Sequence, residues 1–322
     1  VPTAKVSGTF GQAIPGIPAS DLIMQDDVQR ITFMSENDDL RANLGCVNGV
    51  NFGIRIMIDL YGNDGTLFES TFMDLGPWSN NQLNQVFGDY APTNGYADVK
   101  SSSSGAAFYC YGSVVDNGSN DPTTVLPAIS SDAMIYYVSA AALAEGAEGS
   151  FFQTDIDVNN TGAAEASYVF MWFPRGHDNS APVQSDPVTL GAGMGARYEN
   201  ILSGVFGAEP PAIGAVGISS SNSADLIVNS RTYNVPTAKV SGTFGQAIPG
   251  VQEDMLIPTG EKKRIIFMSE NDDFRANLGC ISGTGTNTRI NVELFDDTGA
   301  SLESTFMDLG PWSNNQLNQV FG

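Results

Sequence analysis

The stretch Ile54-Arg55-Ile56-Met57-Ile58-Asp59-Leu60 decides the fold class of this chain. Its apolar residues alternate along the chain, which is the two-residue period of a strand with one buried face. The stretch returns as residues 288–294, where one face stays largely apolar while Met57 becomes Asn291. A strand with one packed face and one variable face is typical of an antiparallel β-sandwich.

A turn sequence follows each of these strands. It is Gly62-Asn63-Asp64-Gly65 after residues 54–60 and Asp296-Asp297-Thr298-Gly299 after residues 288–294. Asn, Asp and Gly tolerate the positive φ angles of tight hairpins, so both turns predict β-hairpins. After the first hairpin we expect a short helical turn over residues 81–87. With 35 Gly, 16 Pro and short apolar runs, the rest of the chain also favours an all-β fold built from Greek-key or immunoglobulin-like sandwiches.

Residues 1–88 return without a gap as residues 235–322, and we call these two segments copy 1 and copy 2. Residues 235–250 repeat residues 1–16 letter for letter, and residues 303–322 repeat residues 69–88. Self-similarity at a fixed period is typical of tandem arrays. We therefore predict three sandwich modules: module A over 1–127, a diverged module B over 128–234, and a second module A over 235–322.

The second module A has no counterpart of residues 89–127. A sandwich without those strands would expose sheet edges and part of its core. We expect either that the natural chain continues in register or that another chain supplies the strands.

Two of the three cysteines are expected to form a disulfide. Aligning module B on module A places Val158 and Ile227 at the positions of Cys46 and Cys110. Because both cysteines are replaced together, we expect the two sites to face each other across the core, in an oxidising compartment. Two buried free thiols are the alternative. Cys280 repeats Cys46, and its expected partner would lie beyond residue 322.

The charge of the chain argues against some partners. Asp and Glu number 36 against 14 Lys and Arg, a net charge of −22. Such a surface repels phosphate backbones, so we expect no nucleic-acid partner. The sequence contains no run of about 18 apolar residues, so it predicts no membrane span. We interpret the carboxylates as a hydrated surface that keeps a long polymer soluble.

Residues 35–39 are rich in carboxylates and recur as residues 269–273, which makes them a candidate site for Ca²⁺. It lacks the spacing of an EF-hand loop. The alternative is a solvated loop in which Arg41 or Arg275 offsets the negative charge. The candidate ligands are Glu36, Asp38, Asp39, Glu270, Asp272 and Asp273.

The sequence offers no recognisable catalytic constellation. His177 is the single histidine, and no nucleophile stands at a spacing that would make it a general base. Zinc sites of the Cys and His kind lack ligands for the same reason. We predict a non-catalytic protein without a cofactor.

Several short motifs recur in the modules. They are residues 41–45, 47–48, 64–65, 82–87, 113–117 and 121–122 in module A, and residues 149–155 and 159–160 in module B. Taken together these motifs resemble the tandem β-sandwich repeat modules of large secreted bacterial surface proteins. The resemblance implies an extracellular array and no assigned catalytic residues. Module B departs from the pattern where Gln153 replaces Arg41.

Two functions of different classes follow. The first is a structural polymer that associates with itself into a surface filament, fibre or stalk, because a scaffold repeats the same contacts many times. The second is an adhesin or carbohydrate-binding array, in which Trp78 and Trp312 of the Gly-Pro-Trp-Ser-Asn-Asn motif would stack on sugars of a glycan. The alternative for these tryptophans is a hydrophobic lid under the sandwich edge. Near-identity of the copies favours the polymer.

Overall fold

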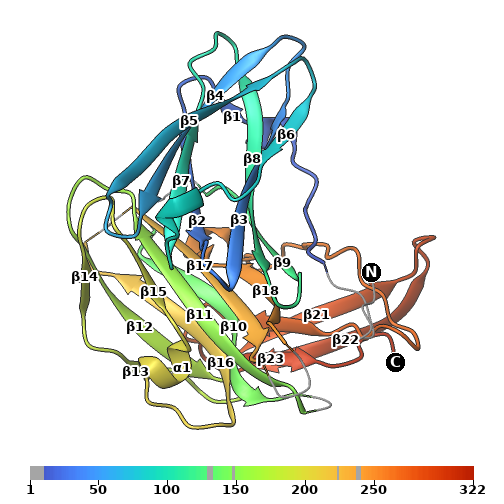
Figure 1. Cartoon of the computed structure of the whole chain (residues 1–322). Coiled ribbons are helices and arrows are strands. Elements are labelled where there is room, and N and C mark those ends of the chain that lie inside the picture. The colour runs from blue at the N-terminus through green and yellow to red at the C-terminus, as the bar shows by residue number, and fades with distance from the viewer. Residues whose placement is uncertain (1–10, 129–132, 147–148, 223–224, 237–240) are drawn as a thin grey trace.

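The computed structural model describes residues 11–128, 133–146, 149–222, 225–236 and 241–322 (Figure 1). Antiparallel strands form nearly all of its regular structure, which confirms the prediction of an all-β fold. In these ranges no helix is long and apolar enough to cross a membrane. The short helical elements are η1 (Ala19–Asp21), η2 (Gly88–Tyr90), α1 (Ile201–Gly204) and η4 (Glu253–Met255).

Module A is a closed sandwich of two sheets. One sheet has the order β1-β8-β3-β6 with β9 added to β8, and the other has the order β2-β7-β4-β5. The strands are β1 (Ile23–Met24), β2 (Val28–Met34), β3 (Leu40–Asn48), β4 (Ile54–Gly62), β5 (Leu67–Leu75), β6 (Asn80–Leu83), β7 (Gly95–Lys100), β8 (Ala107–Asp116) and β9 (Pro122–Val125).

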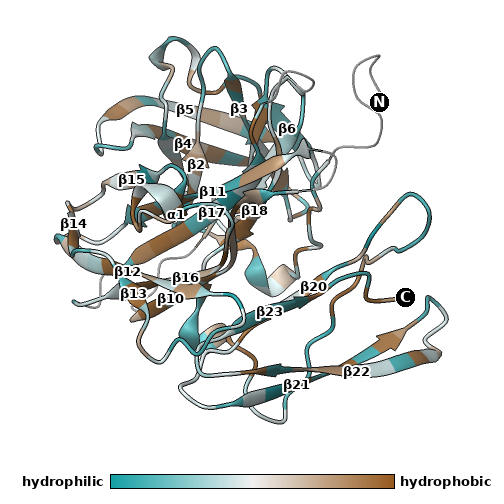
Figure 2. Cartoon of the chain, turned by 90° about the horizontal axis from the view of Figure 1, so that it is seen from below, coloured by the Kyte–Doolittle hydropathy of each residue, from teal (hydrophilic) through white to brown (hydrophobic). Residues whose placement is uncertain are grey.

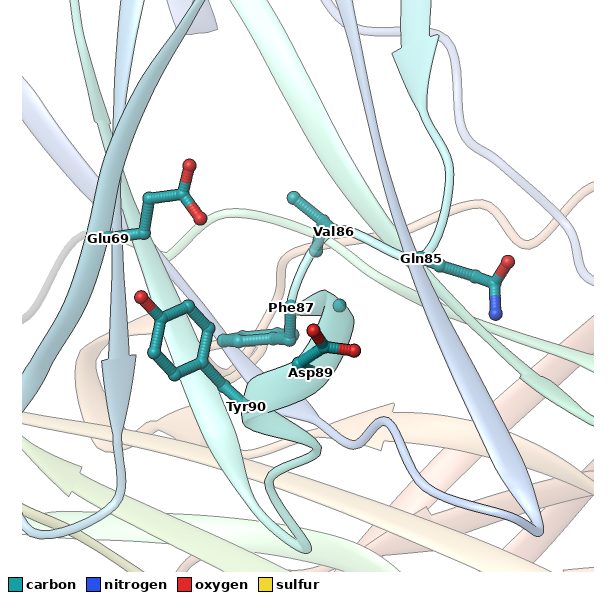
Figure 3. A pocket seen from close by; sticks show the side chains of 7 residues that line it. Glu69, Gln85, Val86, Phe87, Asp89 and Tyr90 are labelled. Atoms are coloured by element: carbon teal, nitrogen blue, oxygen red, sulfur yellow. The ribbon is translucent and has the colours of Figure 1, made fainter.

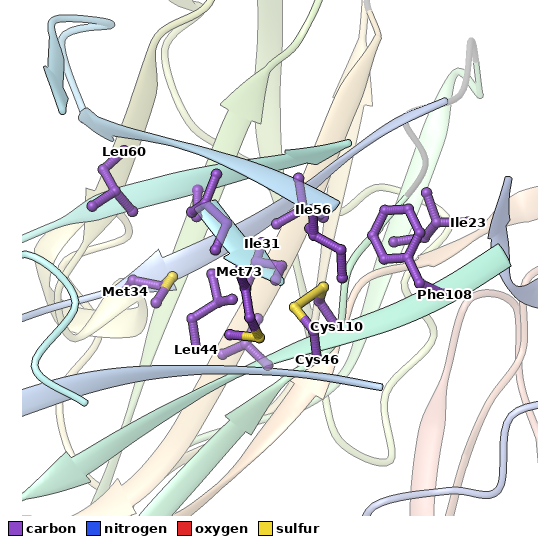
Figure 4. Packing of buried hydrophobic residues seen from close by; sticks show 14 of the residues in the cluster. Ile23, Ile31, Met34, Leu44, Cys46, Ile56, Leu60, Met73, Phe108 and Cys110 are labelled. Carbon is purple, nitrogen blue, oxygen red and sulfur yellow. A yellow bond between two sulfur atoms is a disulfide. The ribbon is translucent and has the colours of Figure 1, made fainter. Parts of the chain in front are cut away.

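Alternation along β4 builds the core between these sheets. Ile54, Ile56, Ile58 and Leu60 are buried, while Arg55 on the other face is exposed. They pack with apolar side chains from both sheets, as the close-up of the cluster shows (Figure 4). The β4–β5 hairpin also forms as predicted.

The predicted helical turn over residues 81–87 is wrong for its first part. Residues 80–83 form strand β6, which pairs with β3 from Leu44 opposite Leu83 to Val47 opposite Asn80. The open edge of β3 satisfies the backbone groups that a helical turn would have satisfied internally. A 3-10 turn follows only at η2.

In module B the strands connect into one ten-stranded sheet, because β10 also pairs with β11. Its order is β13-β12-β16-β10-β11-β17-β18, with β14 added to β12, β15 to β11 and β19 to β10. The bounds are β10 (Ile135–Glu145), β11 (Phe151–Asn160), β12 (Ala166–Pro174), β13 (Val183–Gln184), β14 (Val188–Leu190), β15 (Gly195–Tyr198), β16 (Ala212–Ser220), β17 (Leu226–Asn234), β18 (Phe244–Pro249) and β19 (Val251–Gln252). Strands β18 and β19 come from copy 2. The sheet of module B therefore includes residues from the next sequence repeat.

The second module A consists of two separate strand pairs, β20 (Leu278–Ile281) with β23 (Asn314–Leu317), and β21 (Thr288–Phe295) with β22 (Ser301–Leu309). Figure 2 shows them as two layers beside module B. Within the described residues, no strand pairs with the second edge of β20 or β21.

Candidate functional site at the module joints

The joint between module A and module B is built from buried polar side chains. Asn94 Nδ2 donates to Asp157 Oδ1 over 2.8 Å, and Asn229 Nδ2 donates to Thr32 Oγ1 over 2.9 Å. All four side chains are buried. Because buried polar groups cost free energy unless they are paired, these bonds fix one orientation of the two modules.

A second set of contacts at this joint is centred on Arg197. Its Nη2 lies 2.8 Å from Asp155 Oδ2, and its Nη1 donates to Ser35 Oγ over 3.0 Å. The guanidinium carbon lies 4.3 Å from the centre of the Phe33 ring. One arginine thus binds an acid of module B, and a hydroxyl and a ring of module A.

Burial raises the pKa of Asp157 to about 6, although hydrogen bonding by Asn94 and the charge of Arg197 act to lower that pKa. A buried acid with a raised pKa is a feature of many active sites. Here, however, Asn159 Nδ2 occupies Oδ2 of Asp157 in addition to the bond from Asn94 to Oδ1. Both carboxyl oxygens are engaged within the protein, which fits a structural role in the joint.

The joint between module B and copy 2 is a shared strand. Strand β18 adds to β17 in antiparallel register, from Asn229 opposite Pro249 to Asn234 opposite Phe244. Asp116 and Asp121 of module A bind the same segment. Asp116 Oδ2 accepts bonds from Thr243 N and Oγ1 over 2.9 and 2.8 Å, and Asp121 Oδ2 accepts one from Gly245 N over 3.0 Å.

Hydrogen bonds keep the Asp116 carboxyl group ionised at this contact. Although its burial acts to raise the pKa, hydrogen bonds from Ser119 and Thr243 lower it below the usual value. The side chain is therefore a charged acceptor, and charge-assisted hydrogen bonds are the stronger kind. Asp116 therefore links the start of β18 to module A, while pairing with β17 links the same strand to module B.

Copy 2 also docks on module B through the loop of residues 310–315, which we call the docking loop. Asn314 Nδ2 donates to the carbonyl of Phe173 over 2.7 Å, and Asn179 Nδ2 donates to the carbonyl of Trp312 over 3.1 Å. Trp312 itself packs on an apolar cluster of module B that includes Tyr137 and Phe173. Neither the β18 contact nor the docking loop was anticipated from the sequence.

The same two segments of copy 1 have little contact. Residues 11–18 are irregular and mostly exposed, with Gln12 Nε2 donating to the carbonyl of Gly245 over 2.8 Å. Residues 76–81 repeat the docking loop, yet Trp78 is 67% exposed. Of the two predicted stacking residues, Trp78 is exposed and Trp312 is half-buried.

A disulfide joins Cys46 and Cys110, whose Cα atoms lie 4.0 Å apart. The two residues are direct neighbours on β3 and β8 of one sheet, so the expectation that they face each other across the core is corrected. Strands β11 and β17 pair Val158 with Val228. The counterpart of Cys110 is therefore Val228, and the alignment that gave Ile227 was one residue out of register.

Cys280 is the unpaired counterpart of Cys46. It lies on β20 opposite Asn315 of β23, and its other edge corresponds to the side on which β8 lies in module A. Burial raises the pKa of its thiol. The thiol therefore stands where the disulfide of module A stands, without the strand that carries the second cysteine.

The Ca²⁺ candidates are not gathered around a common point. Glu36 is buried and its Oε2 accepts bonds from the backbone N–H groups of Phe87 and Ala42, while Glu270 accepts one from Phe321. In the part of the chain that the structure describes, no three Asp, Glu, His or Cys side chains are grouped so that they could hold a metal ion. The remaining candidates, Asp38, Asp39, Asp272 and Asp273, are all exposed.

Among the described residues, Arg41 forms no ion pair with these carboxylates. Its Nη1 and Nη2 donate to the side-chain oxygens of Asn117 and Asn120 over 2.7 and 3.1 Å. The arginine therefore links the start of β3 to the loop after β8.

Two further surface features carry polar groups. An open hollow beside η2 is lined by Glu69 and by residues 85–90, with the Glu69 carboxylate near the Tyr90 ring (Figure 3). Its charged groups are both acidic. His177 is exposed, and the neighbouring Asp178 carboxylate accepts bonds from Ser180 N and Oγ. Neither feature combines groups that would act together on a substrate.

Comparison with known proteins gives no family. No protein-family model matches the chain, and no curated protein matches it. A solved structure described as an anti-sigma factor domain-containing protein is similar over 66% of this chain and 80% of its own, at 6% identity and a TM-score of 0.19. A likeness at that level carries no argument about fold or function.

Proposed function

We propose that this chain is a non-catalytic structural repeat protein of the extracellular space, a segment of a surface filament, fibre or stalk. One observation carries the proposal. The segments that copy 1 and copy 2 share letter for letter include those by which copy 2 joins module B, namely residues 243–250 and the docking loop.

The sandwich strands between these segments have changed more. Ile54 has become Thr288 and Met57 has become Asn291, whereas residues 69–88 are unchanged in copy 2. A repeat that keeps its joints while the strands between them vary is expected in a scaffold, where every unit contacts its neighbours in the same way.

The joints would also hold the modules at fixed angles. The polar contacts around Asp157 are buried from solvent, and β18 is hydrogen-bonded to groups of both modules. The Cys46–Cys110 disulfide suits an oxidising compartment. The net charge of −22 would keep assembled fibres apart in solution.

Negative-stain electron microscopy of the protein from its native source tests this role. We expect fibres of regular repeat in the absence of any ligand. Isolated particles the size of one chain, at concentrations where surface fibres persist, would overturn the proposal. Recombinant residues 1–322 on the same grids serve as the size reference.

A second function, binding of carbohydrate, is favoured by one observation. The Trp78 ring is exposed between polar residues of the 76–81 loop, and exposed aromatic rings with polar neighbours suit recognition of a sugar face. A glycan array separates the two functions. If copy 1 binds sugars, Trp78→Ala abolishes the signal, while Trp312→Ala, at the covered counterpart, preserves it.

A further inference from the structure

Copy 1 contains two surfaces that its own structure does not explain. Gly11 and Gly16 have no other atom of the described residues within 4 Å of the place where a Cβ would stand. Their counterparts in copy 2 have no such space. A Cβ on Gly245 would overlap Tyr233, and one on Gly250 would lie 2.6 Å from the Cβ of Val228.

These glycines are required only where the segment lies against β17. Glycine is the residue that permits close backbone approach, and it is otherwise unfavourable in a strand. In copy 1 the same glycines stand in a segment that forms no strand, and Ile14 is 54% exposed there. The sequence of residues 11–16 therefore matches an acceptor that this segment does not contact here.

The docking loop gives an independent observation of the same kind. In copy 2, Asn314 is buried against Phe173 and Trp312 packs on module B. In copy 1, the identical Asn80 and Trp78 are exposed. Copy 2 uses both surfaces on one module at the same time, so one B-type module would satisfy both in copy 1.

We propose that residues 11–16 and 76–81 of copy 1 are a docking surface for a further B-type module, one whose β17 edge is free. Residues 11–15 add to that edge as β18 does, and Trp78 and Asn80 bind its β10 and β12 strands as Trp312 and Asn314 do here. The module B of this chain is excluded as the partner because β18 already occupies its β17. The inference deepens the proposed structural role and rests on it, since it names the contact by which repeats join.

Strand addition of this kind combines main-chain hydrogen bonds with side-chain fit, and it removes an exposed sheet edge. The resulting array would consist of modules each completed by a strand from the next repeat.

The test uses the full chain with residues 244–250 replaced by seven Gly and Ser residues, which frees the β17 edge. We expect this variant to self-associate head to tail in analytical ultracentrifugation through its own residues 11–16. Adding Gly11→Val should weaken the association at least ten-fold, because the new side chain has open space in copy 1 but collides with the acceptor. When Trp312→Ala and Asn314→Ala are added so that the docking loop no longer covers module B, Trp78→Ala should weaken the association further.

A monomeric variant with folded module B and an exchangeable β17 edge would overturn the proposal. If loss of β18 destabilises module B instead, the peptide of residues 9–16 should restore amide protection in β17, and the Gly11→Val peptide should not. Absence of rescue overturns the proposal equally. If strand addition is observed but the native protein forms no fibres on microscopy grids, the docking contact is supported and the filament role is contradicted. Failure of this inference and failure of the proposed function are therefore distinguishable.

Discussion

Copy 1 and copy 2 place nearly the same sequence in different environments. Phe33 is 2% exposed in copy 1, and its counterpart Phe267 is 95% exposed in copy 2. The hairpins do not share this difference: β21–β22 pairs Thr288 with Leu309 as β4–β5 pairs Ile54 with Leu75, and both shift register at the same place. Hairpin formation is thus a property of the local sequence, whereas burial of Phe33 is not.

The cause is the pair of strands that only module A has. Strand β2 pairs with β7, and β3 pairs with β8. Residues 262–268 repeat β2, and in the described part of copy 2 they have no strand partner. An isolated strand has too few contacts to offset the entropy of ordering it.

The largest effect should come from completing copy 2. Appending a copy of residues 89–127 after Gly322 supplies the missing strands, and we expect residues 262–268 to become a protected strand in hydrogen exchange. Burying Ile265 and Phe267 alone contributes roughly 1.5–3 kcal/mol each. Appending the same residues in scrambled order is the control. Unchanged exchange in 262–268 would show that copy 2 differs from copy 1 for another reason.

Removing the disulfide should affect only copy 1. Cys110→Ala opens a bridge between residues separated by 64 positions, and the chain-entropy model gives a loss of about 4 kcal/mol for module A. Cys280→Ala, at the counterpart of Cys46, should change the stability of copy 2 far less. Thermal unfolding under non-reducing conditions measures both. Equal effects would mean that Cys280 has a stabilising contact of its own.

A matched pair of core substitutions compares packing directly. Ile31 is fully buried and Ile265 is 63% exposed. We expect Ile31→Ala to destabilise module A by about 3 kcal/mol and Ile265→Ala to change stability by less than about 0.5 kcal/mol. Urea unfolding followed by hydrogen exchange resolves the two modules. In the chain completed with residues 89–127, the Ile265→Ala effect should rise toward that of Ile31→Ala.

The sequence was informative where structure is local or periodic. Alternation in β4 and the glycine turn at residues 62–65 predicted the hairpin, and the gap-free repeat indicated which strands copy 2 lacks. The joint replacement of two cysteines predicted the disulfide, although it placed the pair across the core and not on adjacent strands of one sheet. A one-residue slip in the last strand of module B still led to Ile227 in place of Val228, because a strand alignment without an anchor has no protection against register error.

The joints could not be predicted from the sequence because their residues are far apart in it. Asn94, Asp157 and Arg197 show no pattern in sequence, and polar residues of these types are usually exposed. The one available signal was the identity of residues 1–16 and 235–250. This identity indicated that the sequence of the segment is constrained. That its partner is β17 is known only from the structure.

The two joints should also respond differently to pH, because only the joint of copy 1 contains Asp157. Burial raises the pKa of Asp157 from 3.8 to about 6, so the folded joint binds a proton more tightly than the unfolded chain. The resulting stabilisation is fully present below about pH 4 and is lost as pH rises through 6, up to about 3 kcal/mol. Asp157→Asn should remove this slope between pH 4 and 6, measured by chemical unfolding. An identical slope in the variant would assign it to other groups.

The smallest effect should be the one that the two copies share. Arg55 lies 2.6 Å from Asp74, and Arg289 lies 2.6 Å from Asp308, with each guanidinium stacked 4.0 Å from a Phe ring. Both ion pairs are exposed, so solvent and salt screen them and their contribution is slight. Arg55→Gln and Arg289→Gln should therefore lower amide protection in their own hairpins by the same small factor, and less at high salt. A larger effect at Arg55 would mean that the β4–β5 hairpin draws on β7 for its stability, and that the hairpins are less independent of the missing strands than their shared register indicates.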